Sequence, residues 1–279
     1  MARIVGALTT SHVPAIGRAI AKNLQQDPYW KPFFDGWAPV HHWLAETRPD
    51  VAVVIYNDHG LNFFLDKMPT FAVGAAATYR NADEGWGLPE LPPFRGELDL
   101  SWHLIESLVG EDFDLTTCQE MVVDHAFTLP LALMVPSQAW PLKVVPVCIN
   151  TVQLPLPSAR RCYALGEAIG RAVNSWPGDQ RVVIVGTGGL SHQLDGERAG
   201  FINKDFDLAF MRSLVHEPRW ATQFDTRALV EQAGTQGVEL LMWLAARATL
   251  GERVQQLHRN YHIPISNTAS GLMLMASAG

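Results

Sequence analysis

Four histidines of this 279-residue chain follow directly on short apolar segments. They are His12, His59, His125 and His192. Imidazole is the side chain best suited both to bind a metal ion and to move protons near neutral pH. One histidine in such a place is usually a hydrogen-bonded structural residue, but four at equivalent places indicate a common site. The other histidines are interpreted as structural, except His262, beside a proline turn, whose role stays open.

Glu239 is the carboxylate that best fits such a site. It lies in an expected helix, Gly237–Leu250, that is apolar almost all round. A carboxylate buried there must be paired, protonated or bound to a cation, because burying it alone is costly. The alternative is a residue of the first helical turn that the helix dipole stabilises, and the residues alone favour neither. Asp58 and Asp124 each precede a histidine and are predicted to form turns or outer contacts.

Two histidines and one carboxylate form the facial triad of non-haem Fe(II) oxygenases, which leaves coordination positions open for substrate and O₂. The same ligand types hold Zn²⁺ in hydrolases. Composition does not decide between the two metals, and spacing does not choose which two histidines are ligands.

The elements that must position these residues alternate between strands and helices. Continuous β-branched segments predict strands buried on both faces, at Arg3–Leu8, Val51–Tyr56, Val144–Cys148 and Arg181–Val185. Apolar residues at helical spacing predict helices, at Gly36–Glu46, Leu98–Val109, Ser158–Ser175, Asn203–Leu214 and Gly237–Leu250. This alternation indicates an α/β protein. Ligands of open α/β sheets bind beyond the carboxyl ends of the strands, so the four histidines are expected to converge there.

Several local features refine this outline. Asp99 or Ser101 is predicted to cap the helix at Leu98–Val109, and Ser158 the helix that it begins. The stretch Pro69–Pro93 reads as a long surface loop, of a length typical of functional loops. Gly186–Gly189 would present backbone N–H groups to an anion, or form a tight turn that aims Ser191 and His192; the turn is favoured. No linker divides the chain, which predicts one domain over residues 1–279.

Composition excludes several classes of protein. The net charge is −7, the pI is near 5.8 and no Lys/Arg cluster occurs, which argues against nucleic acid as a partner. The three cysteines are widely spaced, which is typical of a reducing compartment and not of a disulfide scaffold. The N-terminus reads as a strand and not a signal peptide, and no apolar run is long enough to span a bilayer. We expect a cytoplasmic protein without membrane contact.

The same residues resemble a known family. Matching segments occur in order over nearly the whole chain: Thr10–Ala15, Tyr56–His59, Ala82–Gly87, Val123–His125, Gly186–Leu194, Ala199–Lys204, Glu239–Trp243 and Tyr261–Ala269. They are similar to the extradiol ring-cleavage dioxygenases typified by the catalytic β subunit of protocatechuate 4,5-dioxygenase. The resemblance implies a single α/β domain with a central mixed sheet flanked by helices on both faces. It also implies Fe(II) held by His12, His59 and Glu239, with His192 as the acid/base and His125 beside it.

The resemblance also bears on the substrate. Ser266 falls where the family contacts the substrate carboxylate, and Asn57 in the segment before His59 is predicted to contact substrate as well. Two positions depart from the family pattern: Arg18 stands where a small residue is expected, and Ala126 where glycine is expected. Arg18 is predicted to pair with a ring carboxylate or to face solvent.

These observations predict extradiol cleavage of a carboxylated catechol, protocatechuate first, with gallate or 3-O-methylgallate as alternatives. A small α subunit that caps the site is the expected partner, which makes a hetero-oligomer. The rival functions are a Zn-dependent hydrolase with the same ligands and a non-enzymatic subunit whose pocket has lost its activity.

Overall fold

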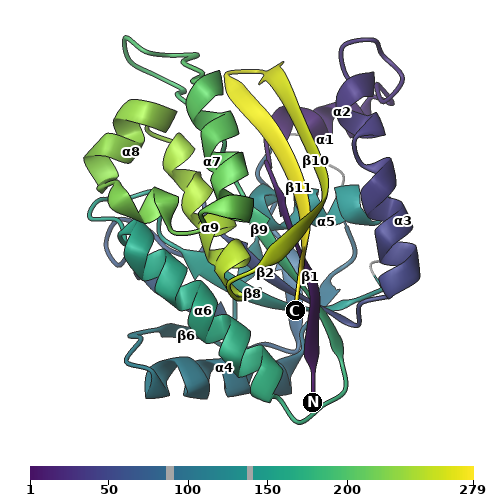
Figure 1. Cartoon of the computed structure of the whole chain (residues 1–279), viewed down its shortest axis with the longest axis vertical. Helices are drawn as coiled ribbons and strands as arrows, with labels where there is room; N and C mark the ends of the chain where they lie inside the picture. Colours follow the sequence, from purple (N-terminus) through teal and green to yellow (C-terminus); the bar gives the residue numbers. More distant parts are fainter. Residues whose placement is uncertain (86–90, 137–140) are drawn as a thin grey trace.

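An eight-stranded mixed sheet forms the centre of the molecule (Figure 1). The structure is a computed structural model and describes residues 1–85, 91–136 and 141–279. The strand order is β10-β11-β1-β9-β2-β8-β3-β6. The inner strands run parallel and are β1 (Arg3–Thr10), β9 (Arg181–Thr187), β2 (Val51–Tyr56) and β8 (Lys143–Ile149). They contain the four predicted strands, and the predicted mixed-sheet α/β fold is confirmed.

The outer strands complete the sheet on both sides. On one side β11 (Thr268–Ser277) pairs antiparallel with β1, and β10 (Val254–Ile265) pairs antiparallel with β11. On the other side β3 (Phe71–Gly74) pairs antiparallel with β8, and β6 (Thr116–Cys118) pairs parallel with β3. The reading of Pro69–Pro93 as a surface loop is therefore wrong at β3, whose residues are all buried. Part of that stretch, residues 86–90, lies outside the described residues.

A small second sheet lies beside the main one, with the order β5-β4-β7. Its strands are β5 (Phe94–Arg95), β4 (Thr78–Asn81) and β7 (Val122–Val123). β4 and β7 pair in parallel, with Arg80 opposite Val122 and Asn81 opposite Val123. This pairing sets the residues after β4 beside the residues after β7.

Helices cover both faces of the main sheet, as predicted (Figure 1). One face packs against α1 (Pro14–Ala21), α2 (Lys31–Asp35), α3 (Ala38–Thr47) and α5 (His125–Met134). The other face packs against α4 (Leu98–Gly110), α6 (Ala159–Ser175), α7 (Lys204–His216), α8 (Thr226–Ala233) and α9 (Leu240–Ala248). Short 3-10 turns precede α8 at Trp220–Gln223 and α9 at Gly237–Glu239.

Strand β2 shows why these segments form inner strands. All of its residues are buried. Val51, Val53 and Ile55 belong to the core under α4, α6 and α9, while Ala52, Val54 and Tyr56 belong to the core under α3 and α5. Successive side chains of a strand point to opposite faces. A strand between two cores therefore needs apolar residues at every position, and burial of each large one contributes about 1.5–3 kcal/mol.

Side-chain caps begin four of the helices, α5, α6, α7 and α8. Ser158 caps α6 by accepting a hydrogen bond from the N–H of Arg161, as predicted. The predicted caps of α4, Asp99 and Ser101, are wrong, because the helix already begins at Leu98 after Glu97. The N–H of Glu97 donates to Val144 O of β8 (3.0 Å), which fixes the chain direction and starts the helix earlier. Ser101 lies within α4, and its hydroxyl donates to Glu97 O.

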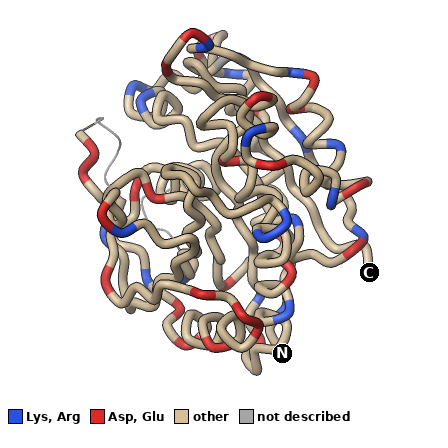
Figure 2. Tube along the Cα trace, turned by 90° about the vertical axis from the view of Figure 1, so that its left-hand side faces the viewer, with Lys and Arg blue, Asp and Glu red and all other residues tan. Residues whose placement is uncertain are grey.

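Basic and acidic residues are interspersed along the chain trace drawn in Figure 2. The three thiols are free and buried. Over the part of the chain that the structure describes, no helix has both the length and the apolar character to cross a membrane.

One charged side chain is fully buried far from the sheet edge that carries the histidines. The guanidinium of Arg247 in α9 donates to three carbonyl oxygens, those of Leu214, Gly251 (2.6 Å) and Glu252 (2.8 Å). Burial lowers the pKa of this arginine. The carbonyls belong to the end of α7 and to the turn after α9, so Arg247 joins these two segments, where helical carbonyls run out of intrahelical donors.

Arg247→Met should therefore destabilise the fold by about 3 kcal/mol, because it leaves the buried carbonyl of Leu214 without this donor, at a cost of roughly 1–3 kcal/mol, and also removes the two part-buried hydrogen bonds to Gly251 and Glu252. The measurement is chemical denaturation, with a shift of the midpoint at unchanged slope. Arg212→Met is the matched control, since Arg212 is an exposed residue of α7. Equal stability of the two variants would contradict a structural role for the Arg247 hydrogen bonds.

Candidate metal centre

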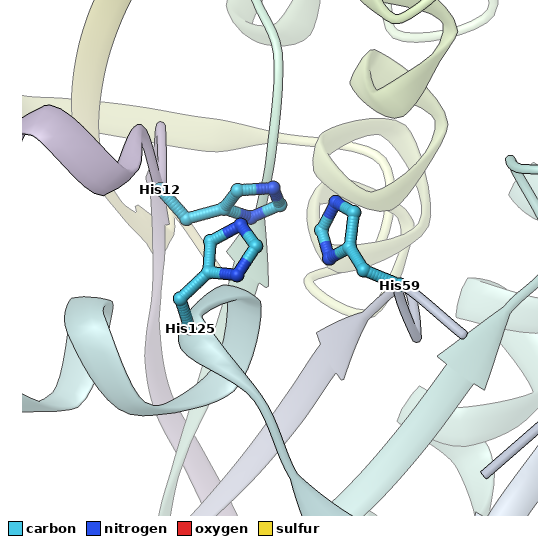
Figure 3. Close-up of side chains that lie close together, drawn as sticks. All are labelled: His12, His59 and His125. Carbon is cyan, nitrogen blue, oxygen red and sulfur yellow. The ribbon is translucent and has the colours of Figure 1, made fainter. Parts of the chain in front are cut away.

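Three of the four histidines meet at the carboxyl edge of the parallel strands (Figure 3). His12 follows β1, His59 follows β2, and His125 is the first residue of α5 after β7. The rings of His12 and His59, and of His12 and His125, are 5.4 Å apart, and those of His59 and His125 stack at 4.3 Å. Their ring nitrogens lie close enough together to share one metal ion. The predicted convergence of the strand-end histidines is observed.

Glu239 contacts two of these histidines from the segment that precedes α9. It ends the 3-10 turn before α9 and is 6% exposed. Its Oε2 lies 3.4 Å from His12 Nε2, and its Oε1 lies 3.6 Å from His59 Nε2. One carboxylate thus bridges two imidazoles from different strands. These two histidines, with Glu239, are the set that the resemblance implies as ligands.

The turn after β9 makes room for this carboxylate. Gly188 has φ +114°, and a Cβ at that position would lie 2.7 Å from Glu239 Cβ. The next residue, Gly189, donates its N–H to Glu239 Oε2 (3.0 Å). The glycine turn therefore donates a hydrogen bond to a carboxylate of the same chain, that of Glu239. It also leads on to His192, as the favoured reading of Gly186–Gly189 predicts.

Outer contacts leave the Nε2 atoms of both histidines directed at Glu239. His59 Nδ1 donates to Asp124 Oδ2 (2.9 Å), and His12 Nδ1 lies 3.2 Å from Thr187 Oγ1. The other nitrogen of each ring faces the site, and it would present its lone pair to a bound metal, as in metal centres where a carboxylate or hydroxyl fixes the tautomer.

Asp58 organises the loop that carries His59. Its buried carboxylate accepts hydrogen bonds from the backbone N–H groups of the four residues Gly60 to Phe63. The prediction that the aspartates beside the histidines form turns and outer contacts matches these contacts. Neither aspartate contacts Glu239 or His12 through any hydrogen bond of the described residues.

The charges of the site suit a divalent cation. Burial would raise the pKa of Glu239, but His12 and His59 hold it well below its usual value, so the carboxylate is ionised. Burial lowers the pKa of His12, which keeps that ring neutral. Burial also lowers the pKa of His59, but hydrogen bonds to Asp124 and Glu239 outweigh it and raise the pKa to about 10. A cation between these groups would replace the proton that His59 holds.

His192 lines the same cavity without an ion-pair contact to Glu239 among the described residues. Its buried Nδ1 has no hydrogen-bond partner within the described residues. Burial lowers its pKa, as do the neighbouring histidines. The backbone of His192 is held on both sides, since its N–H donates to Ala233 O (2.7 Å) and its carbonyl accepts from Gly237. A neutral ring on a fixed backbone is suited to proton transfer.

A cavity of about 510 Å³ opens above these groups. That volume lies in the range of small-molecule sites. Its wall includes the predicted substrate contacts Asn57, Arg18 and Ser266. Arg18 is exposed and has no ion-pair partner in the described part of the chain. Ser266 lies in the turn between β10 and β11 with φ +57°.

Comparison with known proteins decides the family. Residues 6–271 match the family described as the catalytic LigB subunit of aromatic ring-opening dioxygenase. The chain belongs to the LigB family. The resemblance is thereby confirmed at the level of the family, a family of ring-opening dioxygenases.

Curated relatives of this LigB chain carry two names. Gallate dioxygenase of Pseudomonas putida is 39% identical over 194 residues, which are 69% of this chain and 57% of that protein. A 2,3-dihydroxyphenylpropionate/2,3-dihydroxicinnamic acid 1,2-dioxygenase of Photorhabdus laumondii is 28% identical over 98% of this chain and 97% of that protein. The Rhodococcus jostii protein of the same name is 34% identical, over 67% of this chain and 56% of that protein. The chain thus spans little more than half of two of these relatives.

A solved structure shares the fold. The uncharacterized protein JW3007 of Escherichia coli K12 matches over 98% of this LigB chain and 99% of that chain, with a TM-score of 0.59 and 14% identity. Protocatechuate stays a prediction for this LigB chain, because the relatives above are named for gallate and for dihydroxyphenylpropionate.

Two contacts of the LigB site escaped sequence reasoning. Thr187 lies next to His12 Nδ1, and Glu84 binds His125. Glu84 belongs to a matched segment, Ala82–Gly87, of which Trp86 and Gly87 lie outside the described residues. An acidic residue in a long loop could have indicated a contact with the site, but the sequence does not show which histidine the loop meets.

Proposed function

We propose that this chain, with residues 1–279 as one catalytic domain, is a non-haem Fe(II) extradiol dioxygenase that opens a carboxylated aromatic diol and inserts both atoms of O₂. The observation that carries the proposal is the ionised Glu239 carboxylate between the Nε2 atoms of His12 and His59, at the floor of a cavity. Two imidazoles and one carboxylate on one side of a cation leave its other side open.

Ferrous iron bound there would supply Lewis acidity toward the diol and the electrons that O₂ chemistry requires. The chain supplies position and proton transfer. His192, neutral and without a partner at Nδ1, accepts a proton from a diol hydroxyl and returns it later. His125 lies beside the metal ligands as a second group for proton transfer.

The relatives favour gallate over protocatechuate as the substrate. Gallate and 2,3-dihydroxyphenylpropionate, for which these relatives are named, both have adjacent ring hydroxyls and a carboxylate. Arg18 supports such a substrate, because it places a guanidinium without a carboxylate partner on the cavity wall. Ser266 and Asn57 would add hydrogen bonds from the same wall.

A capping partner fits the mouth of the cavity. Val152 and Leu194 line the cavity and are 49% and 54% exposed, and Leu154 nearby is 71% exposed. Apolar side chains at a cavity mouth are typical of a surface that a partner covers. We propose a small α subunit in this place.

The test is O₂ uptake by protein loaded anaerobically with Fe(II), measured with gallate, protocatechuate, 3-O-methylgallate and 2,3-dihydroxyphenylpropionate. One O₂ should be consumed for each ring opened, and gallate should give the highest kcat/KM. Each assay is repeated with a candidate α subunit. Turnover that continues without O₂, or that Zn²⁺ supports as well as Fe(II), would instead establish the hydrolase.

Arg18→Ala should raise KM for a carboxylated diol about tenfold, because a hydrogen bond to a charged group contributes roughly 1.5–3 kcal/mol and Arg18 is exposed. KM for unsubstituted catechol should stay constant. Arg160→Ala, at another exposed arginine without ion pairs in the described residues, is the control. An equal rise for both diols would mean that Arg18 does not bind the carboxylate.

A further inference from the structure

The short pairing of β4 with β7 brings an acidic residue to the segment that carries His125. Asn81 is opposite Val123, and the N–H of Ala82 donates to Val123 O (2.8 Å). Two strands in parallel register then end side by side. Glu84 lies two residues after Ala82, and His125 lies two residues after Val123.

Both carboxylate oxygens of Glu84 bind His125. Oε2 accepts a hydrogen bond from the backbone N–H of His125, and Oε1 accepts one from its ring Nδ1, both at 2.7 Å. The two side chains are 8% and 4% exposed. A bidentate contact that joins the backbone and the ring of one residue fixes the ring's rotation as well as its position.

Asp124 does not take this role although it precedes His125. Its Oδ2 accepts from the backbone N–H and the Nδ1 of His59, and its Oδ1 accepts from Ala126 N–H at the start of α5. The stacked rings of His59 and His125 are therefore held by two different carboxylates, which reach them from different loops.

Resting on the dioxygenase function proposed above, we propose that Glu84 is a positioning residue for that reaction. It holds the Nδ1 proton of His125, so that Nε2 is the nitrogen presented to the cavity that His125 lines. The ring is thereby kept as a hydrogen-bonding and proton-transfer group beside the ligands His12 and His59. The Ala82–Gly85 segment becomes part of the active site, although it touches neither metal ligand through any contact of the described residues.

A purely structural role is the alternative that the test must separate. A negative side chain at the first residues of a helix stabilises that helix whatever the orientation of the ring. Glu84 would then affect stability and leave both the ring proton and the turnover number unchanged.

The experiment compares Glu84→Gln and Glu84→Ala with Glu120→Gln, a control at an exposed glutamate of the segment between β6 and β7. Nitrogen-15 NMR of the metal-free full chain, labelled at histidine and assigned with His125→Gln, reports which ring nitrogen of His125 is protonated. The hydrogen-bonded Nδ1 proton should be present in the wild type and in the control. It should be lost or shared with Nε2 in both Glu84 variants.

Kinetics give the second readout. Outer-shell contacts of this kind are typically worth 10–100-fold. We expect kcat to fall by about that factor in both Glu84 variants, with bound Fe(II) unchanged and with KM changed less than kcat. An unaltered Nδ1 proton and kcat in Glu84→Gln, with or without a lower Tm, would overturn the proposal. If the wild type opens no diol, the dioxygenase function fails, and the NMR comparison still decides whether Glu84 holds His125.

Discussion

Fe(II) binding should disappear, and ring opening with it, when His12 is replaced by alanine. The variant removes one of the two imidazoles that contact the Glu239 carboxylate, so the cation loses one of its proposed donors. Even outer contacts change metal affinity 10–100-fold, so loss of a ligand should raise the Kd for Fe(II) by more than about a hundredfold. The measurement is iron per chain after anaerobic loading and desalting, together with a titration by calorimetry.

His42→Ala is the control for His12→Ala, because His42 lies exposed on α3, away from the cavity wall. The arrangement of three rings around one point makes a specific contrary result possible. Retention of iron by His12→Ala, with loss of iron in His125→Ala, would show that His59, His125 and Glu239 are the ligands. The proposed roles of His12 and His125 would then be exchanged.

His192→Ala should have the opposite signature, with iron retained and turnover lost. The ring of His192 lines the cavity, and its pKa is lowered by burial and by the neighbouring histidines, so it is neutral and able to accept a proton near pH 7. General acid–base catalysis contributes typically 10²–10⁴-fold, and kcat should fall by about that factor. Single-turnover assays at saturating diol separate this loss from weaker binding.

Iron content and the spectrum of the diol complex provide the internal control, because both should match the wild type in His192→Ala. His216→Ala, at the exposed end of α7, tests the effect of removing a histidine as such. Wild-type kcat in His192→Ala would exclude this residue as the acid/base and leave His125 as the candidate.

The sequence predicted the inner sheet better than its edges, for a physical reason. β1, β2, β8 and β9 lie between two cores, so each is a continuous apolar segment that is easily recognised. β10 is an edge strand with polar and exposed residues, and its turn to β11 has Ser266 and not glycine in the left-handed region. Nothing local marks such a strand or its hairpin. β3 is only four residues long, within a stretch rich in turn residues.

The candidate site was predictable where it depends on strand direction. The carboxyl ends of parallel strands meet at one edge, which places His12, His59 and His192 together once β1, β2 and β9 are known. Glu239 stood out because a carboxylate in an apolar helix requires a partner. The choice of Glu239's two imidazole neighbours, and the contact of Glu84 with His125, depend on loop paths and on the two-residue strand β7. Local sequence patterns do not encode those paths.

The adjacency of Asp124 and His125 constrains the length of the chain at that point. Asp124 accepts a hydrogen bond from the ring of His59, and the next residue, His125, donates one from its own ring to Glu84. Consecutive residues thus take part in two separate hydrogen bonds. Inserting or deleting a single residue between Val123 and Ala126 would move either Asp124 away from His59 or His125 away from Glu84. Libraries that vary loop length in this chain should leave that junction untouched and place their changes in the segment between β6 and β7.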